Sequence, residues 1–212
     1  MGRGINLMEL IMSAPEDDVR LARLAQAGEV AAFDRIARQY QVILLRFVRR
    51  NFPNIPDAED IVQESLLRAF ENIGKYRPAW PLKSWLLTIT CRVAVNQIRH
   101  HSVQSRLMAN LRHRCVTASA GPRDSTADHD ESLNLWNAAA RLLTPTQFRA
   151  VWLLYAEEMD RHDIARILGK SRPTTRLILY RAKKILQSHF SASAAESISN
   201  SADSRVAQGV VL

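Results

Sequence analysis

Apolar residues recur at intervals of three and four along most of the chain, and this periodicity constrains the fold more than any other feature. The segment 31–52, for example, places Phe33, Ile36, Tyr40 and Phe47 on one helical stripe. Glycine is scarce, with 7 in 212 residues, and we find no segment with the strict alternation of a half-buried strand. We therefore predict an all-α protein.

Changes in composition divide the chain into an N-terminal extension, two helical domains joined by a linker, and a tail. Their predicted bounds are 1–16, 17–104, 105–130, 131–190 and 191–212. The linker is polar with Gly121 and Pro122 at its centre, so we expect it to be flexible. The tail is rich in Ser and Ala and has no aromatic residue, so we expect it to be disordered.

The chain is basic, with 29 Lys and Arg against 21 Asp and Glu, which favours nucleic acid or an anionic membrane surface as a partner. No apolar run approaches the roughly 20 residues that span a bilayer, and the run near the N-terminus is too short for a signal peptide. Cys91 and Cys115 make no disulfide framework, so a reducing compartment fits. We expect a cytoplasmic protein without membrane insertion.

The segment from 163 to 180 has the pattern of a helix-turn-helix. Ala165 is small enough for two helices to cross closely, and Gly169 can take the positive φ that ends the first helix. Ser171 can cap the second helix, and Pro173 falls in its first turn. An exposed cationic face then carries Arg172, Arg176, Tyr180 and Lys183. This face suits the major groove of DNA, although a solvated face on an ordinary helical hairpin would look the same.

The first domain contains an acidic helix that is unexpected in a basic chain. Asp57 can cap this helix, with Glu59 and Asp60 in the first turn, and the exposed face continues through Glu64 and Glu71. An acidic face suits a positively charged protein better than DNA. The alternative is that the acidic first turn only stabilises the helix dipole.

Aromatic and cationic side chains alternate just before and within the next helix of the first domain. The loop and helix start carry Tyr76, Arg77, Trp80 and Lys83, and one helix face carries Trp85, Thr88, Arg92, Asn96 and Arg99. Rings that stack on unpaired bases beside cations that hold phosphates are typical of single-stranded DNA binding. Trp85 has a second interpretation as a core residue, because a tryptophan at helical spacing is usually buried.

Taken together, these segments resemble the extracytoplasmic-function sigma factors, the minimal group of the sigma-70 family. Segment 57–70 is similar to the family's polymerase-binding helix with its Asp-x-x-Gln-Glu core, and 82–86 is similar to its Phe-x-x-Trp-Leu segment. Segments 142–145, 163–169 and 181–184 resemble its second domain. The resemblance implies a region 2-like bundle and a region 4-like helix-turn-helix domain.

The resemblance also implies partners and roles. Contacts with the β′ clamp helices of core RNA polymerase are expected from Asp60, Gln63 and Glu64. Recognition of the −10 element is expected from Tyr76, Arg77, Trp80, Lys83, Arg92, Asn96 and Arg99. Recognition of the −35 element is expected from Arg172, Thr174, Thr175, Arg176, Tyr180, Arg181, Lys183 and Lys184. An anti-sigma factor is an expected partner, whereas catalytic residues, metals and cofactors are not expected.

The sequence departs from the family at positions near the bases. Segment 91–96 replaces the usual Arg-Asn-Leu-Ala-Ile-Asp, and 173–178 replaces the usual Gly-Thr-Val-Lys-Ser-Arg. These departures leave the promoter sequence open.

Two other functions remain to be compared with a sigma factor. A regulator could use the helix-turn-helix without binding polymerase, but then the acidic helix and the aromatic loop have no role. A metal site could be built from His100, His101, His113 and Cys115, although these residues have no companion acid for catalysis.

Overall fold

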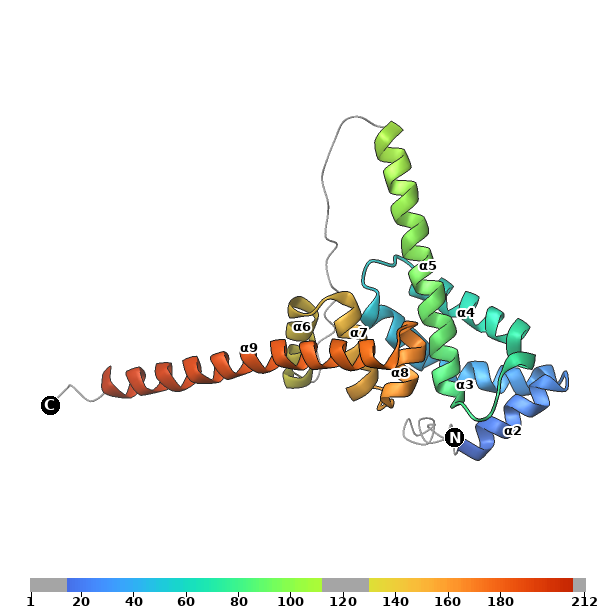
Figure 1. Ribbon diagram of the computed structural model, residues 1–212, viewed down its shortest axis with the longest axis horizontal. Coiled ribbons are helices and arrows are strands. Elements are labelled where there is room, and N and C mark those ends of the chain that lie inside the picture. Colours follow the sequence, from blue (N-terminus) through green and yellow to red (C-terminus); the bar gives the residue numbers. More distant parts are fainter. Residues whose placement is uncertain (1–14, 112–129, 208–212) are drawn as a thin grey trace, which may run out of the picture. The chain divides into compact units, whose positions relative to one another are not determined.

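The computed structural model describes the backbone of residues 15–111 and 130–207, and the side chains of residues 17–100 and 135–191. Every regular element in these ranges is a helix, which confirms the predicted all-α class. The chain divides into two compact units, one comprising residues 1–121 and 166–169 and the other residues 122–165 and 170–212 (Figure 1). Most of the predicted N-terminal extension and most of the predicted linker lie outside the described residues, and the first described helix begins within the last two residues of the extension.

The first unit is built from four α-helices and a 3-10 turn among the described residues. They are α2 (Pro15–Gln26), α3 (Val30–Asn51), α4 (Ala58–Asn72), η1 (Ile73–Lys75) and α5 (Leu82–Leu111). Consecutive helices pack against each other, and α5 also packs on α3. The chain turns sharply after α2 because Gly28 adopts a φ of 95°, a conformation that glycine takes without steric cost.

The core of the first unit contains the apolar stripe expected for segment 31–52. Ile36, Leu44 and Phe47 of α3 are fully buried, as is Val62 of α4. Tyr40 is also buried, and its hydroxyl donates a hydrogen bond of 2.5 Å to Asp18 Oδ2 on α2. Burial, and next this carboxylate, raises the pKa of the Tyr40 phenol well above its ordinary value. The stripe and this polar contact together join α2 to α3.

The second unit contains α6 (Asp130–Leu142), α7 (Pro145–Tyr155), most of α8 (Arg161–Leu168) and α9 (Arg172–Ala207). Its core includes three rings, with centroids 4.7 Å apart for Trp136 and Trp152 and 6.1 Å apart for Trp136 and Phe148. Thr144 begins α7 with a reciprocal capping box, in which its side chain and that of Gln147 each bond the other residue's backbone N–H. These contacts support the helix-turn-helix formed by α8 and α9.

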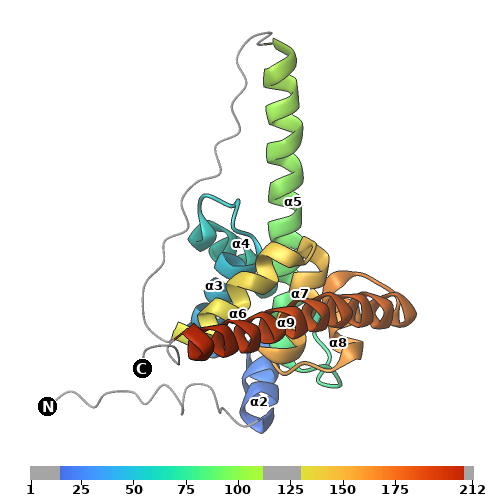
Figure 2. The same cartoon turned by 90° about the vertical axis from the view of Figure 1, so that its left-hand side faces the viewer.

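Two helices extend further than the sequence periodicity suggested. Helix α5 continues to Leu111, and in two views its C-terminal part extends beyond the other helices of its unit (Figure 1; Figure 2). Helix α9 continues to Ala207, through much of the segment expected to be disordered. Neither α5 nor the part of α9 after Pro173 contains a glycine or proline to end the helix.

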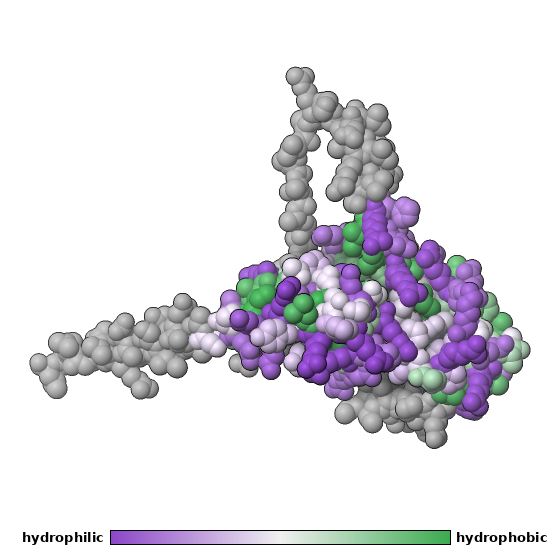
Figure 3. Space-filling view, in the orientation of Figure 1, coloured by the Kyte–Doolittle hydropathy of each residue, from purple (hydrophilic) through white to green (hydrophobic). Residues whose placement is uncertain are grey.

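Hydrophilic side chains predominate on the described surface seen in Figure 3, with smaller apolar patches between them. Among the described residues, no helix is both long enough and apolar enough to cross a bilayer.

Candidate functional surfaces

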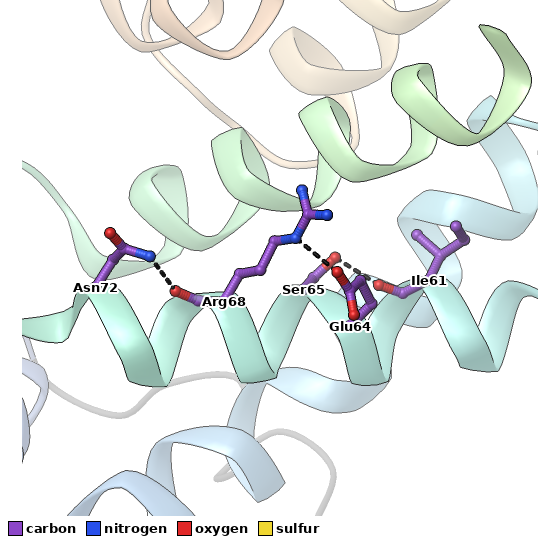
Figure 4. Close-up of polar contacts among 5 residues, drawn as sticks. All are labelled: Ile61, Glu64, Ser65, Arg68 and Asn72. Carbon is purple, nitrogen blue, oxygen red and sulfur yellow. Dashed lines mark hydrogen bonds and ion pairs between the residues drawn. The ribbon is translucent and has the colours of Figure 1, made fainter. Parts of the chain in front are cut away.

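The acidic helix α4 presents an open polar surface. Asp60 and Gln63 are exposed, and Glu64 is half-buried. Glu64 Oε1 accepts a hydrogen bond of 2.6 Å from Arg68 Nε, one helical turn further on (Figure 4). The three residues predicted to bind polymerase therefore lie close together, and two of them project into solvent.

The cap of α4 explains why the Asp60 carboxylate is available. Asp57 Oδ1 accepts a hydrogen bond of 3.0 Å from the Asp60 backbone N–H, as predicted. Glu59 on the same turn forms an ion pair with Arg49 of α3. Asp57 therefore caps the helix and Glu59 contacts the neighbouring helix. Neither contact uses the Asp60 side chain.

A hollow of about 680 Å³, which could not be predicted from the sequence, lies between α4 and α5. Its lining comprises Asp60, Ile61, Gln63, Glu64, Leu67, Arg68, Val93, Asn96, Gln97 and His100. Asn96 was predicted to contact DNA, but it shares this hollow with the acidic residues of α4. Helical spacing within α4 or α5 alone could not reveal a surface formed by both.

The loop before α5 differs from the prediction at Tyr76. Tyr76 is only 2% exposed, so its ring has no open face for stacking on a base. Its ring packs against Trp85 with centroids 5.4 Å apart, and its hydroxyl donates a hydrogen bond of 2.8 Å to the Trp80 carbonyl. Burial, and next the negative charge of Asp18, raises the pKa of Tyr76 to about 12. Tyr76 thus anchors the loop from inside.

The other residues predicted to contact the −10 element lie on this loop or on α5. Arg77 and Arg92 are exposed, as are Asn96 and Arg99, and Lys83 is half-buried. Trp80 lies at the end of the loop, directly before Pro81 and α5, and its backbone N–H bonds the Arg77 carbonyl at 3.0 Å. Trp85 is 7% exposed and belongs to the core, which agrees with its interpretation as a core residue.

The first helix of the helix-turn-helix ends as the sequence predicts. Gly169 adopts a φ of 61°. Its N–H bonds the Arg166 carbonyl at 3.1 Å, and the Lys170 N–H bonds the Ala165 carbonyl at 2.9 Å. These two bonds form a Schellman motif, which satisfies carbonyls that the helix end would otherwise leave unpaired.

The second helix, α9, begins at the predicted cap. Ser171 Oγ accepts a hydrogen bond of 3.3 Å from the Thr174 N–H. Most of the residues predicted to contact the −35 element are exposed, namely Arg172, Thr174, Arg176, Tyr180, Arg181, Lys183 and Lys184. Thr175 is the exception, because it is 0% exposed and its hydroxyl bonds the Ser171 carbonyl at 3.1 Å. It therefore packs inside the helix-turn-helix and presents no group to DNA.

Arg172 has a contact that the sequence did not predict. Its Nε donates a hydrogen bond of 2.9 Å to His162 Nδ1 on α8. The arginine at the start of α9 is thereby held against the preceding helix.

Only one of the four candidate ligands of the alternative metal site has a described side chain. His100 is exposed and lines the hollow between α4 and α5. His101, His113 and Cys115 lie outside the residues whose side chains are described. Across the described side chains, no group of three or more His, Cys, Asp or Glu residues is arranged to hold a metal ion.

Comparison with known proteins identifies both units. Sigma-70 region 2 matches residues 36–103, and sigma-70 region 4 matches residues 134–186. The chain is 26% identical over 178 residues to the ECF RNA polymerase sigma factor BldN of Streptomyces coelicolor, covering 82% of this chain and 67% of BldN. It is 27% identical over 173 residues to the ECF sigma factor SigE of Mycolicibacterium smegmatis, covering 80% of this chain and 66% of SigE.

The chain thus spans about two thirds of the length of both relatives. A solved structure of the sigma factor RpoE from Bartonella quintana, in complex with the anti-sigma factor NepR, shares the fold. It has a TM-score of 0.60 and 22% identity, and the match covers 74% of this chain and 94% of RpoE. The two matched regions, in the order and on the units described above, show that the chain belongs to the sigma-70 family of RNA polymerase sigma factors, within its extracytoplasmic-function group.

Proposed function

We propose that this chain directs core RNA polymerase to specific promoters and assists melting of the −10 element. In this proposal the first unit docks on the β′ clamp helices and traps the melted strand, while the second unit reads the −35 duplex. The observation that carries the proposal is the contrast between two exposed faces. Asp60 and Gln63 project from α4, and Arg172 and Arg176 project from α9.

Docking on polymerase is assigned to Asp60, Gln63 and Glu64. The Asp60 carboxylate and the Gln63 amide are open to a partner, and a cationic partner is favoured by the surrounding acidic residues. Glu64 is already paired with Arg68, so a basic side chain of the partner would have to compete with that arginine. We therefore expect Asp60 and Gln63 to contribute more to affinity than Glu64.

Capture of the melted −10 strand is assigned to Trp80, with Arg77, Lys83, Arg92, Asn96 and Arg99 holding phosphates or base edges. A DNA stacking step is worth about 1.4 kcal/mol, so opening several steps requires extruded bases to be bound. Tyr76 acts indirectly in this proposal, because its hydrogen bond to the Trp80 carbonyl fixes the loop that carries the ring. The isolated chain should consequently bind promoter duplex weakly.

An anti-sigma factor and a cytoplasmic location complete the proposal. The related RpoE structure is a complex with an anti-sigma factor. A protein of this family must also meet core polymerase where transcription occurs. The chain supplies no covalent chemistry in this scheme, since polymerase makes the phosphodiester bonds.

Run-off transcription with purified core polymerase tests the proposal. Adding the chain to core enzyme should give transcripts with defined start sites from a subset of genomic fragments. Absence of any promoter-specific transcript would overturn the proposal. If the chain also failed to co-purify with polymerase but still bound duplex DNA, the helix-turn-helix regulator would replace the sigma factor as the better account.

A further inference from the structure

The start of α9 carries apolar side chains within its cationic face. Leu177 is 46% exposed and Tyr180 is 63% exposed. A surface hollow on this face is lined by Arg172, Pro173, Arg176, Leu177 and Tyr180. A single exposed leucine on a protein is ordinary. The unusual feature is the position of Leu177 directly between residues that are expected to meet DNA.

Helical spacing arranges these side chains in two adjacent rows. Arg172, Arg176 and Tyr180 are four residues apart and form one row, and Pro173 and Leu177 form the second row beside it. The buried side of α9 is marked by Thr175 and Ala182, each 0% exposed. These buried positions lie on the far side of the helix. Pro173 and Leu177, which we call the apolar row, therefore do not pack into the core of their own unit.

The charge of α9 favours DNA as the occupant of this face. No Asp or Glu occurs between Arg172 and Ala195. Arg181, Lys183 and Lys184 follow the apolar row and are exposed, which suits phosphate contacts. In a helix-turn-helix, the first residues of the second helix meet the base edges, and this is where Arg172, Pro173, Arg176 and Leu177 lie.

Only one base presents an apolar group in the major groove, and that group is the thymine 5-methyl. Arginine, by contrast, pairs with the O6 and N7 atoms of guanine. We infer that the apolar row, with Leu177 as its main member, reads a thymine methyl in the −35 element, next to a guanine read by Arg176. This inference rests on the proposed function, because it requires α9 to enter the major groove at a promoter.

Replacing thymine with deoxyuridine tests this inference, because it removes only the methyl group. The polymerase holoenzyme formed with the full chain is used, on a promoter from which it starts transcription, with each −35 thymine replaced in turn. We expect one replacement to lower transcription by about four-fold, the effect of losing one buried methyl-sized group. With Leu177→Ser, thymine and deoxyuridine templates should become equal, whereas Leu177→Met should keep a preference for thymine.

Leu135→Ser is the matched control, because Leu135 is an exposed leucine on α6 of the same unit. This variant should leave the ratio between the two templates unchanged. If promoter-specific transcription occurs but no deoxyuridine replacement alters it, the inference is overturned and the proposed function stands. If the four-fold preference persists in Leu177→Ser, the assignment to Leu177 is wrong. If no promoter-specific transcript forms with any template, the proposed function itself fails.

Discussion

The outer faces of α4 and α9 differ more than the helices themselves do. Each helix buries an apolar side in its own unit, through Val62 and Ala69 in α4 and through Leu179 and Ala182 in α9. The outer face of α4 carries exposed acids, whereas that of α9 has exposed arginines and lysines and no acid before Glu196. The buried sides therefore determine the fold, whereas the outer faces determine which class of partner each unit can bind.

The two helices also differ in how they are capped. Asp57 caps α4 with a carboxylate, and Ser171 caps α9 with a neutral hydroxyl. A carboxylate stabilises a helix N-terminus through the helix dipole, but it would repel a phosphate approaching that end. A hydroxyl satisfies the backbone N–H without this repulsion, so the N-terminus of α9 keeps its attraction for anions. The caps therefore agree with the partners assigned to the two units.

The largest effect is expected from removing the arginines of α9. Arg172→Ala with Arg176→Ala should lower promoter-specific run-off transcription at least about 30-fold, because each base contact is worth about 1–3 kcal/mol. Both side chains are exposed, and the hydrogen bond that Arg172 loses to His162 lies at the surface, so the melting temperature should change little. Arg20→Ala with Arg141→Ala removes the same charge from exposed positions elsewhere and serves as the control. An equal loss in the control would mean that only net charge matters.

The next largest effect is expected at the acidic face of α4. Asp60→Ala with Gln63→Ala should weaken binding to core polymerase roughly ten-fold, or about 1.4 kcal/mol, measured by titrating labelled chain with core enzyme. Glu59→Ala is the matched control, because Glu59 lies on the same turn but contacts Arg49. If the double variant bound core polymerase with unchanged affinity, the acidic first turn would only stabilise the helix dipole.

Local features of both units could be predicted from the sequence, because they depend on a few neighbouring residues. The caps at Asp57 and Ser171 and the positive φ of Gly169 are such features. The burial of Tyr76 and Thr175 could not be predicted, because it depends on how helices distant in sequence pack. The exposure of Leu177 likewise depends on which side of α9 packs within its unit.

The different caps allow the two units to be destabilised separately. Asp57→Ala should cost about 1 kcal/mol and lower hydrogen-exchange protection in α4 while sparing α9. Ser171→Ala should do the reverse at a similar cost. Asp57→Asn is the control, because asparagine caps as well as aspartate but lacks its charge. If either change lowered hydrogen-exchange protection in both units, the two units could not be destabilised separately.

The smallest effect concerns how the stability of the first unit depends on pH. The folded pKa of Tyr76 is about 12, above its ordinary value of 10.0. The neutral phenol is therefore favoured by folding, and its contribution is complete below pH 10 and is lost as the pH rises towards 12. Tyr76→Phe removes the hydrogen bond to the Trp80 carbonyl, so at pH 8 it should lower the free energy of unfolding by about 1 kcal/mol.

The stability difference between wild type and Tyr76→Phe should shrink as the pH rises from 10 to 12, because the wild type alone must keep the Tyr76 phenol protonated. Urea unfolding followed at several pH values measures this difference. Tyr40, whose pKa is raised chiefly by burial and Asp18, is present in both proteins, so most of its contribution cancels in the comparison. The second unit lacks a buried tyrosine among its described residues, since Tyr155 and Tyr180 are exposed, so the effect should be confined to the first unit. A difference that stays constant to pH 12 would show that Tyr76 does not anchor the loop through its hydroxyl.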